Sequence, residues 1–272
     1  KRLSNTEPKK AQRLLDHAFA LYECLPARQI ALPTLAAQIT GDSHALDYGQ
    51  PLAGINMPLL ASIHQIHAWQ TPDERRSVWA AHGVLCDALS QPVLVCNMRL
   101  APSHPLGPFL ESAYRLTEPA YLTLRQLSRF PLQTKEDCTF HHAYICENPA
   151  VTAANIEANG ADSHPLICTS GNLTSSAQTL LTQLSASGIN LHYHGDFDWP
   201  GLRIANFVFE KFGALPWRMD HQSYLAATGE KQLSGSPAES PWDPTLQSAM
   251  LQRGTAVYEE QVIDALLADL RL

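Results

Sequence analysis

The sequence contains no apolar run close to the roughly 20 consecutive residues that a membrane-spanning helix requires, so it predicts no such helix. The chain begins at Lys1 and carries no charged-then-apolar leader. We therefore expect a soluble fragment or trimmed chain from which an N-terminal segment can be missing.

Paired cysteines are also absent. No Cys-x-x-Cys pair occurs, which argues against both a zinc ribbon and a disulfide scaffold. In a chain of 272 residues this usage indicates a reducing compartment, and we expect a cytoplasmic protein. We expect most of the cysteines to be small apolar core residues: Cys24, Cys86, Cys96, Cys138, Cys146 and Cys168.

Positive charge is scarce in the second half of the chain. Residues 131–272 contain 7 Lys and Arg against 16 Asp and Glu, a net of −9, whereas residues 1–130 contain 12 against 10, a net of +2. The overall charge of −7 speaks against a nucleic-acid binder. The uneven distribution suits a cation-binding site attached to a module that meets a polyanion, although ordinary variation in surface charge explains it equally well.

The first half of the chain is predicted to be mainly helical. Residues 8–30, "PLLASIHQIHAW" and "DERRSVWAAHGVLCDAL" repeat apolar residues at three- and four-residue spacing. Between them, "GDSHALDYGQPLAG" is a polar, glycine-rich loop whose residues indicate no particular chemistry. "PVLVCNMRL" is a short apolar run that favours a strand. We place a mainly helical, DNA- or partner-contacting region at residues 1–135.

From residue 138 the pattern changes to strands that alternate with helices. "FHHAYICE", "HPLICTSG", "INLHYHGDFD" and "ALPWRMD" favour strands, and helical segments follow the first three. This alternation predicts βαβ crossovers, and hence an α/β fold with a largely parallel sheet flanked by helices, at residues 136–272. "AVYEEQVIDALLADLRL" is predicted to be a C-terminal helix.

Acidic residues follow two of these predicted strands. Glu147 ends the first strand, while Asp196 and Asp198 end the third. The small-residue loop Ser170-Gly171-Asn172 follows the second strand. Because ligands bind outside the carboxyl ends of strands in such sheets, we expect these residues to surround one site.

The strict alternation in "HYHGDFD" admits a zinc site or a phosphatase site. His-x-His-x-Asp begins the ligand set of metallo-β-lactamases, but Phe197 stands where that set requires a further histidine. Asp-x-Asp also opens the motif of haloacid-dehalogenase phosphatases. There it lies on the first strand and is followed by a threonine, whereas here Trp199-Pro200 follows.

A magnesium site and a purely structural role are the other two interpretations. Mg²⁺ takes one or two protein carboxylates and leaves the remaining positions to water and phosphate. Asp196 and Asp198 can supply such ligands, and Glu147 can ligate the same ion or move a proton. In the structural interpretation Asp198 caps the helix that starts near Pro200 and Asp196 fixes a turn.

Three motifs together resemble the Toprim domain: "YICENPAV", "LICTSGNLTSSAQTLLTQL" and "HGDFDWPGLRIA". The last two look most like the Toprim domain of the topoisomerase VI A subunit. The longer signatures "TGDSHALDYGQPL", "YHGDFDWPGLRIAN" and "AVYEEQVIDALLADL" resemble a bacterial family similar to the JetD subunit of Wadjet-type anti-plasmid defence systems, which act beside an SMC-like ATPase complex. The likeness covers nearly the whole chain.

This resemblance implies a catalytic site. It makes Glu147 the general acid/base or a metal ligand, and Asp196 and Asp198 the ligands of Mg²⁺ or Mn²⁺. The family's C-terminal acidic motif falls on Glu259 and Glu260; we assign a catalytic role to Glu260 and keep Glu259 as a possible additional acidic residue. The resemblance implies a fold in which these residues share the rim of one sheet.

The resemblance also implies a function. We expect a metal-dependent DNA endonuclease that hydrolyses phosphodiesters of double-stranded DNA, such as a circular plasmid, with an SMC-like partner complex and a possible homodimer. The alternatives are a non-catalytic Toprim-fold adaptor that binds DNA or the ATPase, and a topoisomerase-like transesterase. The second needs an attacking tyrosine, and no tyrosine of this chain lies in a matching motif.

DNA contacts must come from residues other than the acidic ones. Arg203 follows the acidic loop by one helical turn and is the expected phosphate clamp, with Ser170 and Gly171 as further phosphate-binding residues. His194 is a candidate for a supporting role near the metal. Other candidate phosphate partners are Lys1, Arg2, Lys9, Lys10, Arg13, Arg75, Arg76, Arg125 and Arg129.

Overall fold

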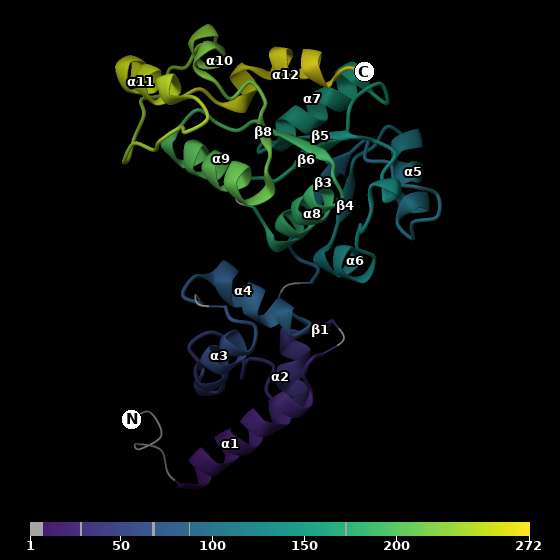
Figure 1. The fold of residues 1–272 in the computed structure, drawn as a ribbon, viewed down its shortest axis with the longest axis vertical. Coiled ribbons are helices and arrows are strands. Elements are labelled where there is room, and N and C mark those ends of the chain that lie inside the picture. The colour runs from purple at the N-terminus through teal and green to yellow at the C-terminus, as the bar shows by residue number, and fades with distance from the viewer. Residues whose placement is uncertain (1–7, 28, 67–68, 87, 172) are drawn as a thin grey trace. The chain divides into compact units, whose positions relative to one another are not determined.

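The computed structural model describes residues 8–27, 29–66, 69–86, 88–171 and 173–272 (Figure 1). The chain divides into two compact units: unit 1 ends at Gln91, and unit 2 runs from Pro92 to Leu272. Within the described ranges, no helix has the length and apolar character needed to cross a membrane.

Unit 1 is mainly helical, as the spacing of its apolar residues predicts. Its elements are α1 (Pro8–Glu23), β1 (Ile30–Ala31), α2 (Leu32–Thr40), α3 (Pro51–Ile63), α4 (Pro72–Ala81) and β2 (Val84–Leu85). The two short strands pair in parallel. Helix α1 ends before Pro26, so the helix expected over residues 8–30 is shorter, because proline lacks the amide hydrogen that a helix interior needs. One core cluster, which includes Leu21, Leu35, Leu60 and Trp79, joins these helices.

Unit 2 is built on a six-stranded mixed sheet with the order β4-β3-β6-β5-β7-β8. The strands are β3 (Val93–Cys96), β4 (Ala120–Leu122), β5 (His142–Cys146), β6 (Leu166–Cys168), β7 (Asn190–Tyr193) and β8 (Leu215–Pro216). Strands β6, β5, β7 and β8 run parallel to one another, while β3 pairs antiparallel with both β4 and β6. The α/β fold is therefore confirmed, and the predicted parallel sheet is one part of a mixed sheet.

Helices cover both faces of this sheet (Figure 1). The helical segments of unit 2 are α5 (Gly107–Arg115), α6 (Leu124–Arg129), η1 (Lys135–Asp137), α7 (Pro149–Asn159), α8 (Ser175–Ala186), α9 (Trp199–Phe212), α10 (His221–Ala226), α11 (Pro244–Arg253), η2 (Glu259–Gln261) and α12 (Ile263–Leu270). Buried residues of α8 and α9 pack with Ile145 and Tyr193 in one core cluster. Residues of α7 and α12 pack with Cys146 and Cys168 in another, so the two helix pairs lie on opposite faces.

The division into units lies at residues 91/92, whereas the sequence led us to expect a boundary at residues 135/136. The segment "PVLVCNMRL" does form a strand, β3, as expected. Its backbone pairs with β6 far along the chain, with Leu94 opposite Cys168, and this ladder joins residues 92–135 to the larger unit. Antiparallel pairing over such a sequence distance is not visible in the local apolar pattern.

The C-terminal helix α12 is held against the sheet by a charged contact. The guanidinium of Arg218, just after β8, donates two hydrogen bonds to the carboxylate of Asp269, one of them 2.7 Å long. The indole Nε1 of Trp217 donates a third, at 3.0 Å. These bonds, with that from Arg218 the largest cause, lower the pKa of Asp269 below its usual value.

We expect Asp269→Asn to lower the free energy of unfolding by about 1 kcal/mol at neutral pH. An arginine–carboxylate ion pair with two hydrogen bonds near the surface contributes on that order. The pKa of Asp269 is depressed in the folded state, so its contribution is present above the unfolded pKa of about 4 and is lost as pH falls through the lower folded value. Urea unfolding at neutral and at acidic pH measures both effects.

The matched control is Asp264→Asn, an exposed aspartate in the first turn of the same helix. It should change stability by less than about 0.5 kcal/mol at either pH. A pH-independent difference between wild type and Asp269→Asn would show that the charge of Asp269 does not stabilise the docking of α12.

Candidate functional site

Glu147 follows β5 directly at the carboxyl end of the parallel strands and is only 8% exposed. Its carboxylate accepts a hydrogen bond from the hydroxyl of Tyr193, which lies on the neighbouring strand β7 opposite Ile145. Gly195 lies against the same carboxylate: a Cβ atom there would come within 2.6 Å of both Glu147 Oε1 and the Tyr193 hydroxyl. The glycine before Asp196 is therefore needed for Glu147 to reach this position.

Glu259 connects the two acidic strand ends. Its carboxylate is fully buried and accepts backbone N–H bonds from Glu147, at 3.0 Å to both oxygens, and from Asn148. Its own backbone N–H donates to Asp196 Oδ1 at 2.9 Å. A short antiparallel bridge between Phe197 and Val257 holds the two chain segments in this register. One residue thus fixes the positions of both Glu147 and Asp196.

Asp196 and Asp198 are half-buried and lie between β7 and α9. Asp198 is the N-cap of α9, and its Oδ1 accepts the backbone N–H of Gly201 at 2.7 Å. A Cβ atom on Gly201 would lie 2.1 Å from the backbone oxygen of Asp196, so only glycine fits there. The capping role expected for Asp198 is confirmed, and the Asp-x-Asp-x-x-Gly spacing follows from this turn.

Burial and mutual repulsion change the protonation of these carboxylates. Burial is the main cause that raises the pKa of Glu147 to about 8; the Tyr193 hydrogen bond opposes it, and the charges of Asp196 and Asp198 add to it. Burial likewise raises the pKa of Asp196 to about 6, against the hydrogen bond from Glu259. The pKa of Glu259 is raised well above its usual value, first by burial and further by the charge of Glu147. Part of each rise in pKa therefore comes from the negative charge of neighbouring carboxylates.

The edge of the sheet that carries Glu147, Asp196, Asp198 and Glu259 is called the acidic rim. The loop after β6 also reaches this rim. The backbone N–H of Gly171 donates to the carbonyl of Glu147 at 3.0 Å, and that of Thr169 donates to Cys146 at 2.9 Å. Ser170 and Gly171 both have positive φ, 55° and 89°, which turns the chain sharply beside Glu147. Ser170 is exposed there. Asn172, the third residue of the expected loop, lies outside the described residues.

Two of the expected site residues, Glu260 and Arg203, form hydrogen bonds with residues other than Glu147, Asp196 and Asp198. Glu260 is exposed, and its carboxylate accepts a bond from the side-chain amide of Asn148. Arg203 is exposed on α9 and donates to the backbone oxygen of Ser236 at 3.0 Å. Of the acidic pair in η2, Glu259 is thus the one that points into the rim, while the catalytic role assigned to Glu260 stays a prediction.

The two histidines of the alternating stretch have aromatic neighbours. His192 bonds to His142 at 3.0 Å and stacks on Tyr144. His194 is fully buried; its Nδ1 lies 2.8 Å from the backbone oxygen of Trp217, and burial lowers its pKa to about 4. Both rings are therefore held by residues other than the aspartates.

The donor atoms at the rim fit a hard cation only in part. Within the described ranges, no three His, Cys, Asp or Glu side chains are grouped so that they could hold a metal ion as they stand. Asp196 and Asp198 nevertheless offer two half-buried carboxylates from one strand end, and Mg²⁺ takes one or two protein carboxylates with water and phosphate in its other positions. These two carboxylates are ligands of the kind that Mg²⁺ or Mn²⁺ accepts, while Glu147 is held by the hydroxyl of Tyr193.

Sequence reasoning missed Tyr193 and the structural role of Glu259. Tyr193 stands between the two histidines of "HYHGDF", and its position in a buried strand was the available signal. Of the candidate phosphate partners, Lys9, Lys10 and Arg13 lie on α1, Arg75 and Arg76 on α4, and Arg125 and Arg129 on α6. Lys1 and Arg2 lie outside the described residues.

Two family models match the sequence. The model described as "Protein of unknown function C-terminus (DUF2399)" matches residues 120–270, more than half of the chain and all of the acidic rim. The model described as "Protein of unknown function N-terminus (DUF3323)" matches residues 1–100. No curated protein matches the sequence.

We expect Glu259→Ala to lower the free energy of unfolding by about 2–4 kcal/mol, because it leaves the buried amides of Glu147 and Asn148 unsatisfied and opens a cavity. Glu260→Ala, the same change one residue later at an exposed position, should cost no more than about 0.5 kcal/mol. Urea unfolding of the two variants compares them directly. Equal losses would mean that the carboxylate of Glu259 does not hold the rim together.

Proposed function

The chain belongs to the DUF2399 family, and we propose that it is a metal-dependent endonuclease that hydrolyses DNA phosphodiesters at the rim formed by Glu147, Asp196 and Asp198. The resemblance of its motifs to the Toprim domain and to JetD-like proteins supports the same activity.

The observation that carries this proposal is the convergence of acidic residues from distant parts of the chain. Glu147 touches Gly195, and Glu259 bonds to the backbone of Glu147 and to Asp196. Burial is the main cause of the raised pKa of Glu147, and the charges of Asp196 and Asp198 raise it further, so these carboxylates destabilise one another. A site that gathers such groups is suited to a cation, which relieves their repulsion.

Asp196 and Asp198 would hold the ion, each with one carboxylate oxygen engaged by a backbone N–H that fixes its orientation. When bound, Mg²⁺ would supply Lewis-acid polarisation of the scissile phosphate and an activated water. Glu147 is placed to hold or move a proton at its carboxylate, which the Tyr193 hydroxyl orients. The exposed turn at Ser170 and Gly171 lies beside Glu147 and offers a place for a phosphate of the substrate.

Tyr193 at the rim is not available as the nucleophile of a transesterification. Tyr193 is fully buried, and its hydroxyl donates to Glu147. An attacking tyrosine must reach the phosphate with its oxygen, which this arrangement prevents. Because the other tyrosines of the chain lie in no motif that matches the attacking tyrosine of topoisomerases, we propose that water is the nucleophile.

The proposed substrate is double-stranded DNA, such as a circular plasmid, presented by an SMC-like ATPase complex. This partner rests on the resemblance of "TGDSHALDYGQPL" and "AVYEEQVIDALLADL" to JetD-like sequences. The acidic charge of residues 131–272 supports the need for a cation and a partner, since a net of −9 repels DNA phosphates.

A non-catalytic adaptor that binds DNA or the ATPase is the second candidate. It is favoured by one observation: the described residues contain no ready three-ligand metal group. The adaptor predicts binding that is indifferent to chelator and to loss of the aspartates, so the experiment below separates the two functions.

We expect purified protein with Mg²⁺ and the SMC-type partner to cut circular DNA, and Asp196→Asn and Asp198→Asn each to reduce the rate by about 10³-fold or more. Asparagine keeps the oxygen that accepts the N–H bond at each position, so the fold should be retained. Conversion of supercoiled plasmid to nicked and linear forms on a gel gives the rate.

The matched control is Asp220→Asn. Asp220 caps α10 through the backbone N–H of Ser223 in the way that Asp198 caps α9, but it belongs to no part of the proposed rim. Its variant should cut at the wild-type rate. Cutting by Asp196→Asn at the rate of this control would reject the assigned site.

Metal binding can be measured without DNA. We expect Mg²⁺ or Mn²⁺ to raise the Tm of the wild-type chain by roughly 5 °C or more once the metal reaches about 100 times its Kd, because an ion that binds only the folded state stabilises it by mass action. Asp196→Asn and Asp198→Asn should abolish this rise, and Asp220→Asn should keep it. A metal-induced shift of equal size in all the variants would place the ion elsewhere.

A further inference from the structure

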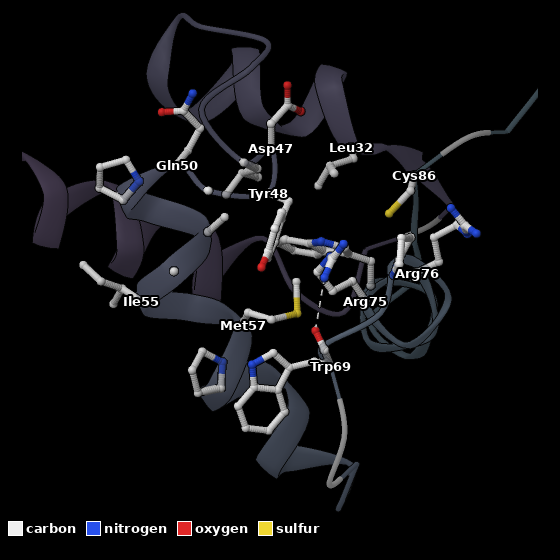
Figure 2. A pocket seen from close by; sticks show the side chains of 18 of the residues that line it. Leu32, Asp47, Tyr48, Gln50, Ile55, Met57, Trp69, Arg75, Arg76 and Cys86 are labelled. Atoms are coloured by element: carbon white, nitrogen blue, oxygen red, sulfur yellow. Dashed lines mark hydrogen bonds between the residues drawn. The ribbon is translucent and has the colours of Figure 1, made fainter.

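Unit 1 contains a cavity of about 1030 Å³ that is separate from the acidic rim and is formed by residues between Lys10 and Cys86 (Figure 2). Its volume is at the upper end of the range for sites that bind small molecules and cofactors. The wall combines aromatic rings with cationic side chains: Tyr48, Trp69, Trp79, Lys10, Arg75 and Arg76. Such a lining suits a ligand with both a flat ring and negative charge.

The loop "GDSHALDYGQ", to which sequence reasoning assigned no chemistry, builds one side of this cavity. Gly41 ends α2 with a φ of 80°, and the carboxylate of Asp42 accepts the backbone N–H of His44 at 2.9 Å. Leu46 anchors the loop in the core with 1% exposure. The loop is thereby fixed as far as Leu46, and Tyr48, two residues later, lines the cavity.

Tyr48 is held in a defined orientation although it is 76% exposed. The guanidinium carbon of Arg75 lies 3.6 Å from the centre of its ring. Arg75 is in turn fixed through NH1, which donates to the backbone oxygens of Trp69, at 3.5 Å, and Gln70 (Figure 2). The guanidinium covers one face of the ring, and the high exposure of Tyr48 leaves the other face accessible. The ring of Tyr48 is therefore already oriented for stacking before any ligand binds.

Charged side chains of both signs line the cavity. Among the described residues of the lining, Lys10, Arg75 and Arg76 are cationic and Asp47 is acidic. Asp47 already bonds to His44 at 2.8 Å, and this hydrogen bond raises the pKa of His44. The lining therefore presents cationic groups to a ligand, and the volume of the cavity is far more than a phosphate alone would need.

We propose that this cavity binds a nucleotide moiety, with its base stacked on the open face of Tyr48 and its phosphate beside the cationic side chains. Bases stack on tyrosine through their π-faces, and arginine pairs with phosphate while also packing on rings. The same ring-plus-phosphate chemistry is offered by a free nucleotide and by an unpaired nucleotide of a DNA strand. This site is independent of the acidic rim and of cleavage.

The test is calorimetric titration of the full chain in EDTA with three probes: deoxyadenosine 5′-monophosphate, a short single-stranded oligodeoxyadenylate, and inorganic phosphate. We expect one or both nucleotide probes to bind more tightly than phosphate. Tyr48→Ala should weaken that binding by about 5- to 150-fold, the range for loss of one base–aromatic stack. Tyr48→Phe keeps the ring and should bind as wild type does.

The matched control sits on α1, outside the cavity lining. Phe19→Ala removes an aromatic ring that is 68% exposed. It should not change binding of the mononucleotide. Because Tyr48 is exposed, its replacement is not expected to unfold unit 1, and a thermal melt of each variant checks this.

The two nucleotide probes distinguish the source of the ligand. Binding of the mononucleotide that depends on Tyr48 indicates a free nucleotide, whereas binding of only the oligonucleotide that depends on Tyr48 indicates an unpaired base of DNA. Absence of binding to both, or binding to which Tyr48→Ala is indifferent, overturns the proposal. Because the assay contains EDTA and no cleavage step, its failure leaves the nuclease proposal untouched, and loss of cleavage in Asp196→Asn says nothing about this cavity.

Discussion

The buried carboxylate of Glu259 is the contact on which the acidic rim depends. It accepts the backbone N–H groups at the end of β5, and its own N–H holds Asp196. Parallel strands leave their terminal amides without ladder partners at the sheet edge, and burial of those amides requires an acceptor. Here the acceptor comes from 112 residues further along the chain. The same bond that satisfies the end of the strand therefore brings the C-terminal segment to the site.

This arrangement explains why glycine occurs where it does in "HGDFDWPG". Gly195 leaves room for the carboxylate of Glu147, and Gly201 leaves room for the backbone of Asp196 under the cap that Asp198 forms. The cost of the arrangement is electrostatic, because several carboxylates share a partly buried space and their charges oppose one another. Stability alone would not favour such crowding, and this is the physical reason to infer a cation-dependent activity there.

Much of the α/β part could be predicted from the sequence, because strands with buried runs and helices with caps are local patterns. The end of β5 was placed correctly, with Glu147 directly after it. The third strand was expected to run to Asp198, but β7 ends at Tyr193, so Asp196 and Asp198 lie in the turn between β7 and α9. The antiparallel addition of β3 could not be predicted, since it depends on a pairing with β6 that no local pattern encodes.

The same limit applied to Glu259 and Glu260: adjacent residues in a short 3-10 turn point in different directions, and only the packing around Glu147 decides which one is buried. Tyr193 was overlooked because a buried tyrosine is ordinarily a core residue.

The charges of the chain set the requirements for any DNA substrate. An acidic rim cannot approach phosphates by attraction, so affinity must come from cationic surfaces elsewhere or from a partner. Arg203, the cation expected beside the chemistry, is directed to the backbone of Ser236, and the cationic side chains around Tyr48 line the cavity of unit 1. If both proposals hold, unit 1 contributes binding through stacking and charge, while unit 2 contributes the reactive groups. Separation of the two tasks would let the acidic rim remain inactive until DNA is delivered to it, because the carboxylates of the rim alone repel phosphates.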